Sequence, residues 1–331
     1  MEEETERIYR LINNYLINTS ENDIVINSLD VFYYFALNVK KLLSDCFDKK
    51  EFDISYSKIT KMKLLDKVDL IKRFYQKNDM IFDLDHCIKN GTIEFRYYDF
   101  FNIKNSDANK RINLTKGIVL QKNGKTNVTI NDNGLVTDIP LTIHELSHFK
   151  NSPDTERSLI NWLFNESLAV AEELICLDFL KSLGYHDEAK LWLRLRYSSL
   201  LKSAKQAIPS YQMFILFKKF GAISDINYRL YFKTIDGYNY LKKRIKEGII
   251  HPIHKLSFYV LATYLGTYMY YEYHKDRSFI KNIENLHKRI NDSDFFTCLK
   301  LINLHNLEKE DIKKLMKALS KMCNRLKNDT H

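Results

Sequence analysis

The chain has 331 residues, enough to bury a substantial core and to form one or two domains. Its composition, 45% hydrophobic and 28% charged, excludes a disordered chain, and the scarcity of Gly (9) and Pro (4) favours a mostly helical protein. The formal net charge is +9, but Lys and Arg alternate with Asp and Glu along most of the sequence. Only residues 242–246 and 313–327 approach a basic cluster, so we expect no nucleic-acid partner.

The cysteines and the N-terminus indicate the cellular compartment. The five cysteines are scattered and include no C-x-x-C pair, which argues against a disulfide framework and favours a reducing environment. The N-terminus is acidic and carries no apolar signal-peptide core. The longest weakly charged run, residues 256–271, is too short and too rich in Tyr to span a bilayer. We therefore expect a cytoplasmic protein without a membrane span, with export by a non-classical route left open.

The first part of the chain is predicted to be helical and the next part to form a sheet. Apolar residues recur at helical spacing in residues 3–17, 28–47 and 59–75. The period then changes to that of strands in residues 92–101, 111–115, 117–121 and 126–130. Asn123-Gly124 lies between the last two and is the preferred pair for a type I′ hairpin turn. The sequence thus predicts a small antiparallel sheet before the helix that follows.

The remainder of the chain is again predicted to be helical. Apolar spacing indicates a helix around residues 139–148 and then helices over 158–183, 186–208 (closed by Pro209), 211–220, 225–233, 237–247, 254–274, 277–290 and 308–326. The expected fold class is mainly α with a small antiparallel β-sheet.

The residues His144-Glu145-Leu146-Ser147-His148 form an H-E-x-x-H pattern on one of these helices. Positions four apart lie about 40° apart around a helix, so His144 and His148 can point at one metal ion. Glu145 then lies beside a water molecule bound to that ion. The pattern predicts a hydrolytic zinc site, which needs a third protein ligand and a free position for water.

The next helix supplies a candidate for the third ligand. Glu166 follows His148 by 18 positions, and Glu173 lies seven residues further along the same helical face. A helix that began at Ser152 would place Glu166 about 20 Å along its axis, too far from the two histidines. A start near Ser158 reduces that distance to about 12 Å. The site therefore requires a loop over residues 150–157.

The motifs resemble those of the glutamate-zincin metallopeptidases, and most closely those of the thimet oligopeptidase and oligoendopeptidase F family. The resemblance is carried by residues 126–132, by residues 137–148, which end in the H-E-x-x-H pattern, and by Phe164-Asn-Glu-Ser-Leu-Ala-Val-Ala-Glu172. The segment from His254 to Gly266 is similar to a late segment of that family. Three features differ from the family: the gap between His148 and Glu166 is shorter, Ser147 stands where Gly is common, and the chain has about half the usual length.

The resemblance implies a zincin-like architecture with one Zn²⁺ ion held by His144, His148 and Glu166. It implies further that Glu145 is the general base. Glu173 is then expected to hydrogen-bond to a ligand histidine and so to orient it. The alternative is that Glu173 is an acid on an exposed helix face. The late segment implies that His254, Tyr259 and Tyr264 contact the substrate and the oxyanion, although His251 competes with His254 for this role.

The leading hypothesis is a zinc metallopeptidase that cleaves extended peptides or proteins. Residues 1–90 are expected to form an N-terminal helical region and residues 91–331 the catalytic domain with the C-terminal helices, the two together making one compact unit. Residues 126–130 are expected to form either an edge strand that pairs with the substrate or an ordinary hairpin strand. Two alternatives stay open: a dedicated effector or toxin-type protease for one protein substrate, and a non-catalytic helical binding protein with a vestigial site.

Overall fold

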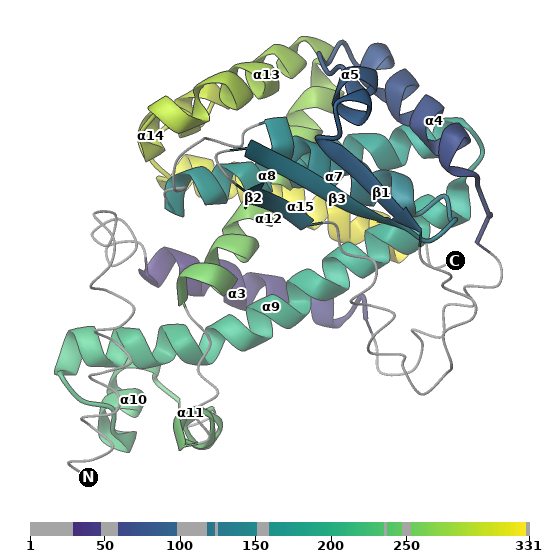
Figure 1. Cartoon of the computed structure of the whole chain (residues 1–331). Coiled ribbons are helices and arrows are strands. Elements are labelled where there is room, and N and C mark those ends of the chain that lie inside the picture. The colour runs from purple at the N-terminus through teal and green to yellow at the C-terminus, as the bar shows by residue number, and fades with distance from the viewer. Residues whose placement is uncertain are drawn as a thin grey trace. The chain divides into compact units, whose positions relative to one another are not determined.

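The structure is a computed structural model that describes residues 29–47, 59–97, 118–122, 125–150, 159–234, 237–246 and 253–328. Within these residues it is mainly helical with one small sheet, as the sequence predicts (Figure 1). The predicted helix over residues 3–17 and the predicted strand over residues 111–115 lie outside the described residues.

The sheet has three strands in the order β1-β3-β2, formed by β1 (Ile93–Tyr97), β2 (Ile118–Lys122) and β3 (Lys125–Asp132). β2 and β3 form the predicted antiparallel hairpin, with Lys122 opposite Lys125. β1, however, runs parallel to β3, with Ile93 opposite Val128. The prediction of an antiparallel sheet is therefore wrong for this pair. Alternation of apolar residues determines which face is buried but not the strand direction, and the long connection from β1 to β2 permits a parallel pairing.

β3 is the central strand of the sheet, because β1 pairs with one side of it and β2 with the other. Of the two alternatives for residues 126–130, the hairpin strand is confirmed and the edge strand is wrong, since β3 has a partner strand on each side. The core-facing side chains Ile93, Val128 and Ile130 are buried. Because β3 is paired on both sides and packed in the core, it fixes the position from which the chain enters the helix with the H-E-x-x-H pattern.

Two helices follow the sheet: α7 (Asp138–Lys150) packs against β2 and β3, and α8 (Leu159–Ser182) packs against α7 (Figure 1). α4 (Leu64–Lys77) also contacts α7. It begins five residues later than predicted, because the chain before it pairs with the segment that leads into α7. There Lys61 forms a β-bridge with Leu135, and the Met62 amide donates to the Gly134 carbonyl.

α9 (His186–Phe220) is one continuous helix that includes Pro209. The prediction that this proline closes the helix is wrong. Pro209 removes one backbone donor, but its neighbours Ile208, Ser210 and Tyr211 are buried, and tertiary packing outweighs the local cost.

The other helices complete the described fold. They are α3 (Leu29–Ser44), α5 (Leu84–Lys89), α10 (Asp225–Phe232), α11 (Tyr238–Lys246), α12 (Ile253–Lys275), α13 (Ile280–Arg289), α14 (Phe295–Leu301) and α15 (Lys309–Asn328), with short 3-10 helices at Arg277–Phe279 and Ile290–Asp292.

The chain divides into two compact units, each built from stretches that are separated in the sequence. The predicted boundary near residue 90 does not coincide with a border between these units. The first unit contains α3, α10, α11 and residues 197–261, so that it takes the second part of α9 and the start of α12. Its core includes the aromatic rings of Tyr33, Tyr211, Tyr228 and Phe232. The second unit contains the sheet, α4, α5, α7, α8 and α13–α15.

Candidate metal centre

α7 is anchored at its first residue by a buried carboxylate. Asp138 accepts hydrogen bonds from the backbone amides of Asn133 and Leu135, both at 3.0 Å, and an ion pair from Lys67 Nζ at 2.7 Å. Lys67 also pairs with Asp132 at the end of β3. A negative charge at a helix N-terminus is favourable, so this network fixes where α7 begins and which way its side chains face.

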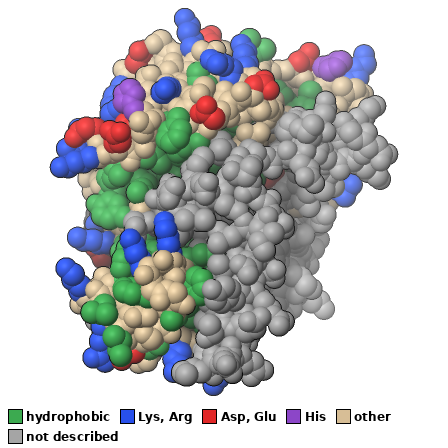
Figure 2. Space-filling view, turned by 90° about the vertical axis from the view of Figure 1, so that its left-hand side faces the viewer, with side chains coloured by type: hydrophobic (Ala, Val, Ile, Leu, Met, Phe, Trp, Pro, Cys, Tyr) green, Lys and Arg blue, Asp and Glu red, His purple; other side chains and the backbone are tan. Residues whose placement is uncertain are grey.

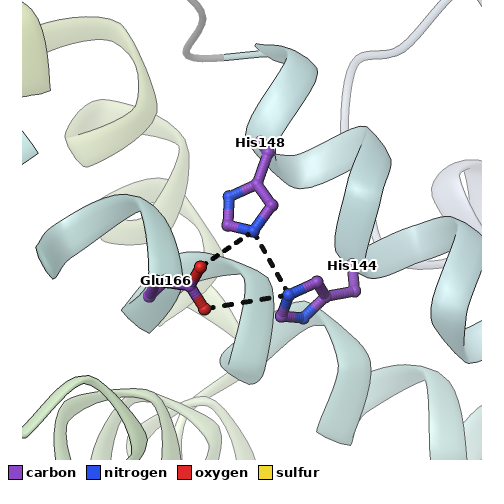
Figure 3. Close-up of side chains that lie close together, drawn as sticks. All are labelled: His144, His148 and Glu166. Carbon is purple, nitrogen blue, oxygen red and sulfur yellow. Dashed lines mark hydrogen bonds and ion pairs between the residues drawn. The ribbon is translucent and has the colours of Figure 1, made fainter. Parts of the chain in front are cut away.

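The structure brings His144, His148 and Glu166 together at the interface of α7 and α8 (Figure 3). The two histidine Nε2 atoms are 3.2 Å apart. Glu166 Oε1 is 3.4 Å from His148 Nε2, and Glu166 Oε2 is 3.8 Å from His144 Nε2. Tetrahedral Zn²⁺ with bonds of about 2.0–2.1 Å separates its ligand atoms by about 3.3 Å. The three donors therefore fit a zinc ion in both chemical type and spacing.

The site is buried and its carboxylate is charged. His144, His148 and Glu166 are all less than a tenth exposed. Burial raises the pKa of the Glu166 carboxyl, but its interactions with His148 and His144 and the charge on Arg196 outweigh it and lower that pKa to about 2. Glu166 is therefore ionised at neutral pH, the form in which a carboxylate binds a metal.

Glu173 lies behind His144, on the side away from Glu166. Its Oε2 atom is 3.0 Å from His144 Nδ1. Nδ1 also lies 3.0 Å from Arg196 Nη2, so it contacts both members of the Arg196–Glu173 ion pair. With Nδ1 as the donor to the carboxylate, Nε2 is unprotonated and faces His148 and Glu166. Glu173 is fully buried, which raises the pKa of its carboxyl, but Arg196 and His144 lower that pKa to about 2. Glu173 thus remains an acceptor at neutral pH.

Two residues that the sequence analysis missed complete this network. Arg196 Nε donates to Glu173 Oε1 at 2.8 Å, and Arg196 Nη2 contacts Glu173 Oε2. Trp192 Nε1 donates to Glu173 Oε1 at 2.7 Å. Trp192 and Arg196 lie one turn apart on α9, but nothing in the sequence distinguishes Arg196 from the nearby Arg194. Only the packing of α9 beside α8 selects it.

A second buried charge cluster holds the other end of α7. Lys150, the last residue of α7, places Nζ 2.9 Å from Glu172 Oε1. His287 of α13 donates to the same oxygen over 2.6 Å. Burial raises the pKa of Glu172, but the charge on Lys150 leads the opposing effects and lowers it to about 2. Burial lowers the pKa of His287. The adjacent residues Glu172 and Glu173 therefore contact α7 at two points, its last residue Lys150 and its middle at His144.

The other predicted site residues are placed less completely. Glu145 lies on α7 beside His144 and is half-buried. His254 falls within α12, but its side chain lies outside the described residues. Tyr259 is half-buried and belongs to the first unit, whereas the metal site belongs to the second. Their roles as substrate contacts stay predictions.

Tyr264 is buried, and its hydroxyl donates to Met316 Sδ of α15 at 3.5 Å. Two residues further along, Gly266 brings the α12 backbone against α8, where a Cβ atom would lie 2.6 Å from the Ser167 carbonyl oxygen. The Tyr264 hydroxyl is thus bonded to a residue of α15. A role for Tyr264 at the oxyanion also stays a prediction.

The predicted loop over residues 150–157 is described only at its borders. Lys150 belongs to the last turn of α7 rather than to the loop, and the first described residue of α8 is Leu159. Residues 151–158 lie outside the described residues. A helix that begins at Leu159 agrees with the position of Glu166 that the ligand geometry requires.

Comparisons with family models, with curated proteins and with solved structures found no match for this chain. Among the described helices, none combines the length and apolar character needed to cross a bilayer. The inference of function therefore rests on the chemistry and geometry of the site.

Proposed function

We propose that this protein is a zinc-dependent metallopeptidase. The observation that carries the proposal is the buried group of His144, His148 and Glu166, whose donor atoms lie 3.2–3.8 Å apart. The H-E-x-x-H pattern adds Glu145 at the position of a general base. A structural zinc site fills all four positions with protein ligands, whereas three ligands leave one position for water, as in hydrolytic sites.

The residues have distinct roles in this proposal. His144, His148 and Glu166 would hold a Zn²⁺ ion, which would supply an acidified water near neutral pH and would polarise the scissile carbonyl. Glu145 would accept a proton from the attacking water and pass it to the leaving amine. Glu173, held by Arg196 and Trp192, keeps His144 in the tautomer that presents Nε2 to the metal.

The substrate in this proposal is a peptide or a protein segment in an extended conformation. Hydrolysis requires the scissile carbonyl to reach the open position of the metal, and an extended backbone exposes its carbonyl groups in this way. The proposal leaves open whether the natural substrate is a pool of short peptides or one dedicated protein.

A quenched-fluorescence peptide library tests the activity. We expect the wild-type protein to cleave library members and Glu145→Gln to lose at least about a hundredfold in rate, because the proton acceptor is removed. The metal ligands are unchanged in this variant, so its zinc content stays that of the wild type. Glu310→Gln, an exposed substitution on α15, is the matched control and keeps full activity.

Two outcomes contradict the proposal. One is a zinc-loaded wild-type protein that cleaves no library member and no candidate protein substrate, which is the result expected of a vestigial site in a binding protein. The other is cleavage that Glu145→Gln leaves unchanged, which places the activity elsewhere or in a contaminant.

A further inference from the structure

Positive charge is dense in residues 218–246, here called the basic segment. It contains eight Lys and Arg against two Asp, a net charge of +6, which residues 313–327 equal with six Lys and Arg and no Asp or Glu. The basic segment covers the end of α9, all of α10 and α11, and it lies within the first unit. The even dispersal of charge expected from the sequence as a whole does not hold here.

The same segment exposes large hydrophobic side chains. Ile226 is 69% exposed and Leu230 65%, and both lie on α10, one turn apart. Phe220 at the end of α9 and Tyr240 on α11 are 40% and 51% exposed. A helix on the surface of a soluble domain normally presents polar side chains to water, so the outer face of α10 has the reverse pattern.

The inner face of α10 shows that this orientation is fixed by packing. Tyr228 is 1% exposed, and its hydroxyl accepts a hydrogen bond from Gln212 at 2.8 Å. Its ring also contacts those of Phe232 and Tyr238. Ser224 caps the first turn by accepting from the Asn227 amide. With Tyr228 anchored inward, Ile226 and Leu230 must point outward.

Cations flank the exposed apolar residues. Arg229 of α10, which pairs with Asp225, is exposed between Ile226 and Leu230, and Lys233 is exposed just after the helix ends. On α11, Leu241 and Ile245 are buried, while Lys242 and Lys246 are exposed on the outer side. Figure 2 shows hydrophobic side chains between Lys and Arg on the lower described surface, at the height of α10 and α11 in Figure 1.

We propose that the basic segment binds the surface of an anionic membrane. Lysines and arginines near such a surface attract acidic headgroups, and the apolar side chains enter the boundary between headgroups and acyl chains. A nucleic acid would match the charge equally well, but it offers no place for the aliphatic side chains of Ile226 and Leu230. The combination of both features therefore favours a lipid surface, and it does so independently of any peptidase activity.

Vesicle co-sedimentation with the full-length protein tests this proposal. We expect binding to phosphatidylcholine vesicles that contain about one-third phosphatidylserine, weak binding to pure phosphatidylcholine, and release at about 0.5 M salt. Lys242→Glu combined with Lys246→Glu is expected to weaken binding at least about tenfold through lost attraction. Ile226→Ser combined with Leu230→Ser is expected to weaken it by a similar factor through lost insertion.

Matched controls come from the second unit. Leu65→Ser with Ile81→Ser removes two equally exposed apolar side chains, and Lys313→Glu with Lys317→Glu reverses two exposed charges. Both control pairs keep wild-type binding. The proposal is overturned if the wild-type protein ignores anionic vesicles, if the control pairs weaken binding as strongly as the variants of the basic segment, or if the protein binds duplex DNA or RNA in preference to the vesicles.

Discussion

Three glutamates of α8 show how position on one helix assigns different roles to the same side chain. Glu166, Glu172 and Glu173 are each less than a tenth exposed, and each has its pKa lowered to about 2 against the effect of burial. Glu166 faces the two histidine Nε2 atoms, Glu173 faces the back of His144, and Glu172 faces Lys150. Sequence spacing indicated Glu166 and Glu173, because they lie seven residues apart on one face of the helix.

The Arg196 side chain is expected to control how firmly the site binds zinc. Arg196→Gln removes the charge that holds Glu173, so that His144 is less firmly oriented and its Nε2 is a weaker donor. We expect zinc affinity, measured by competition with a chelating dye, to fall about 10- to 100-fold.

Arg194→Gln is the control for this substitution, since it lies two residues away on a different face of α9 and should leave zinc affinity near the wild-type value. Equal losses in both variants would mean that the effect arises from general destabilisation of α9 and not from Glu173.

At the level of residues, much of the candidate site could be predicted from the sequence. The H-E-x-x-H pattern and the spacing to Glu166 and Glu173 are local features of two amphipathic helices. Arg196 and Trp192 could not be predicted, because their contact with Glu173 depends on how α9 returns along α8. Lys67 is similar: its buried ion pairs with Asp132 and Asp138 join segments about 70 positions apart, and no local pattern encodes them.

At the scale of elements, α7 is the unit that the surrounding structure orients. Its N-terminus is held by Asp138 and Lys67, and its C-terminus by the ion pair between Lys150 and Glu172. Rotation of α7 would turn His144 and His148 away from Glu166, so both anchors preserve the geometry of the ligands. The adjacent glutamates of α8 contact the helix at two points, 29 and 22 positions away in sequence.

The ion pair at the end of α7 is expected to matter for stability. Lys150→Met leaves the fully buried Glu172 without its cation, so we expect the free energy of unfolding, from denaturant titration, to fall by about 3 kcal/mol. The double variant Lys150→Met with Glu172→Gln removes the buried charge as well and should recover most of that loss.

A double variant that is destabilised by the sum of its two single substitutions would contradict this account of the pair, because uncoupled substitutions add. Lys313→Met, which removes an exposed lysine from its pair with Glu310, serves as the control and should change stability by less than about 1 kcal/mol.

The elements themselves were predicted with uneven success. The β2–β3 hairpin and the long helices agree with the sequence, because apolar periodicity and an Asn-Gly pair are strong local signals. Pro209 and the pairing of β1 depend on tertiary packing, and both were predicted wrongly. The short helices α5 and α14 were missed, since six and seven residues are too few to show a clear period.

At the scale of the whole molecule, the chain is divided between two units with different surfaces and contents. The second unit contains all three candidate metal ligands and the residues that orient them. A half-buried cluster also joins its C-terminal helix to α8, where Asp178 accepts from Tyr270 and from Arg325 of α15, both at 2.6 Å. The first unit contains the basic segment, whose net charge is +6.

The metal content of the purified protein tests the central claim most directly. Elemental analysis is expected to find one zinc ion per wild-type chain, none in His148→Ala, and one in Glu310→Gln, which alters an exposed acid of α15 outside the ligand group. A folded wild-type chain that contains no zinc after incubation with Zn²⁺, or a His148→Ala variant that retains it, would contradict the assignment of His144, His148 and Glu166 as a zinc site.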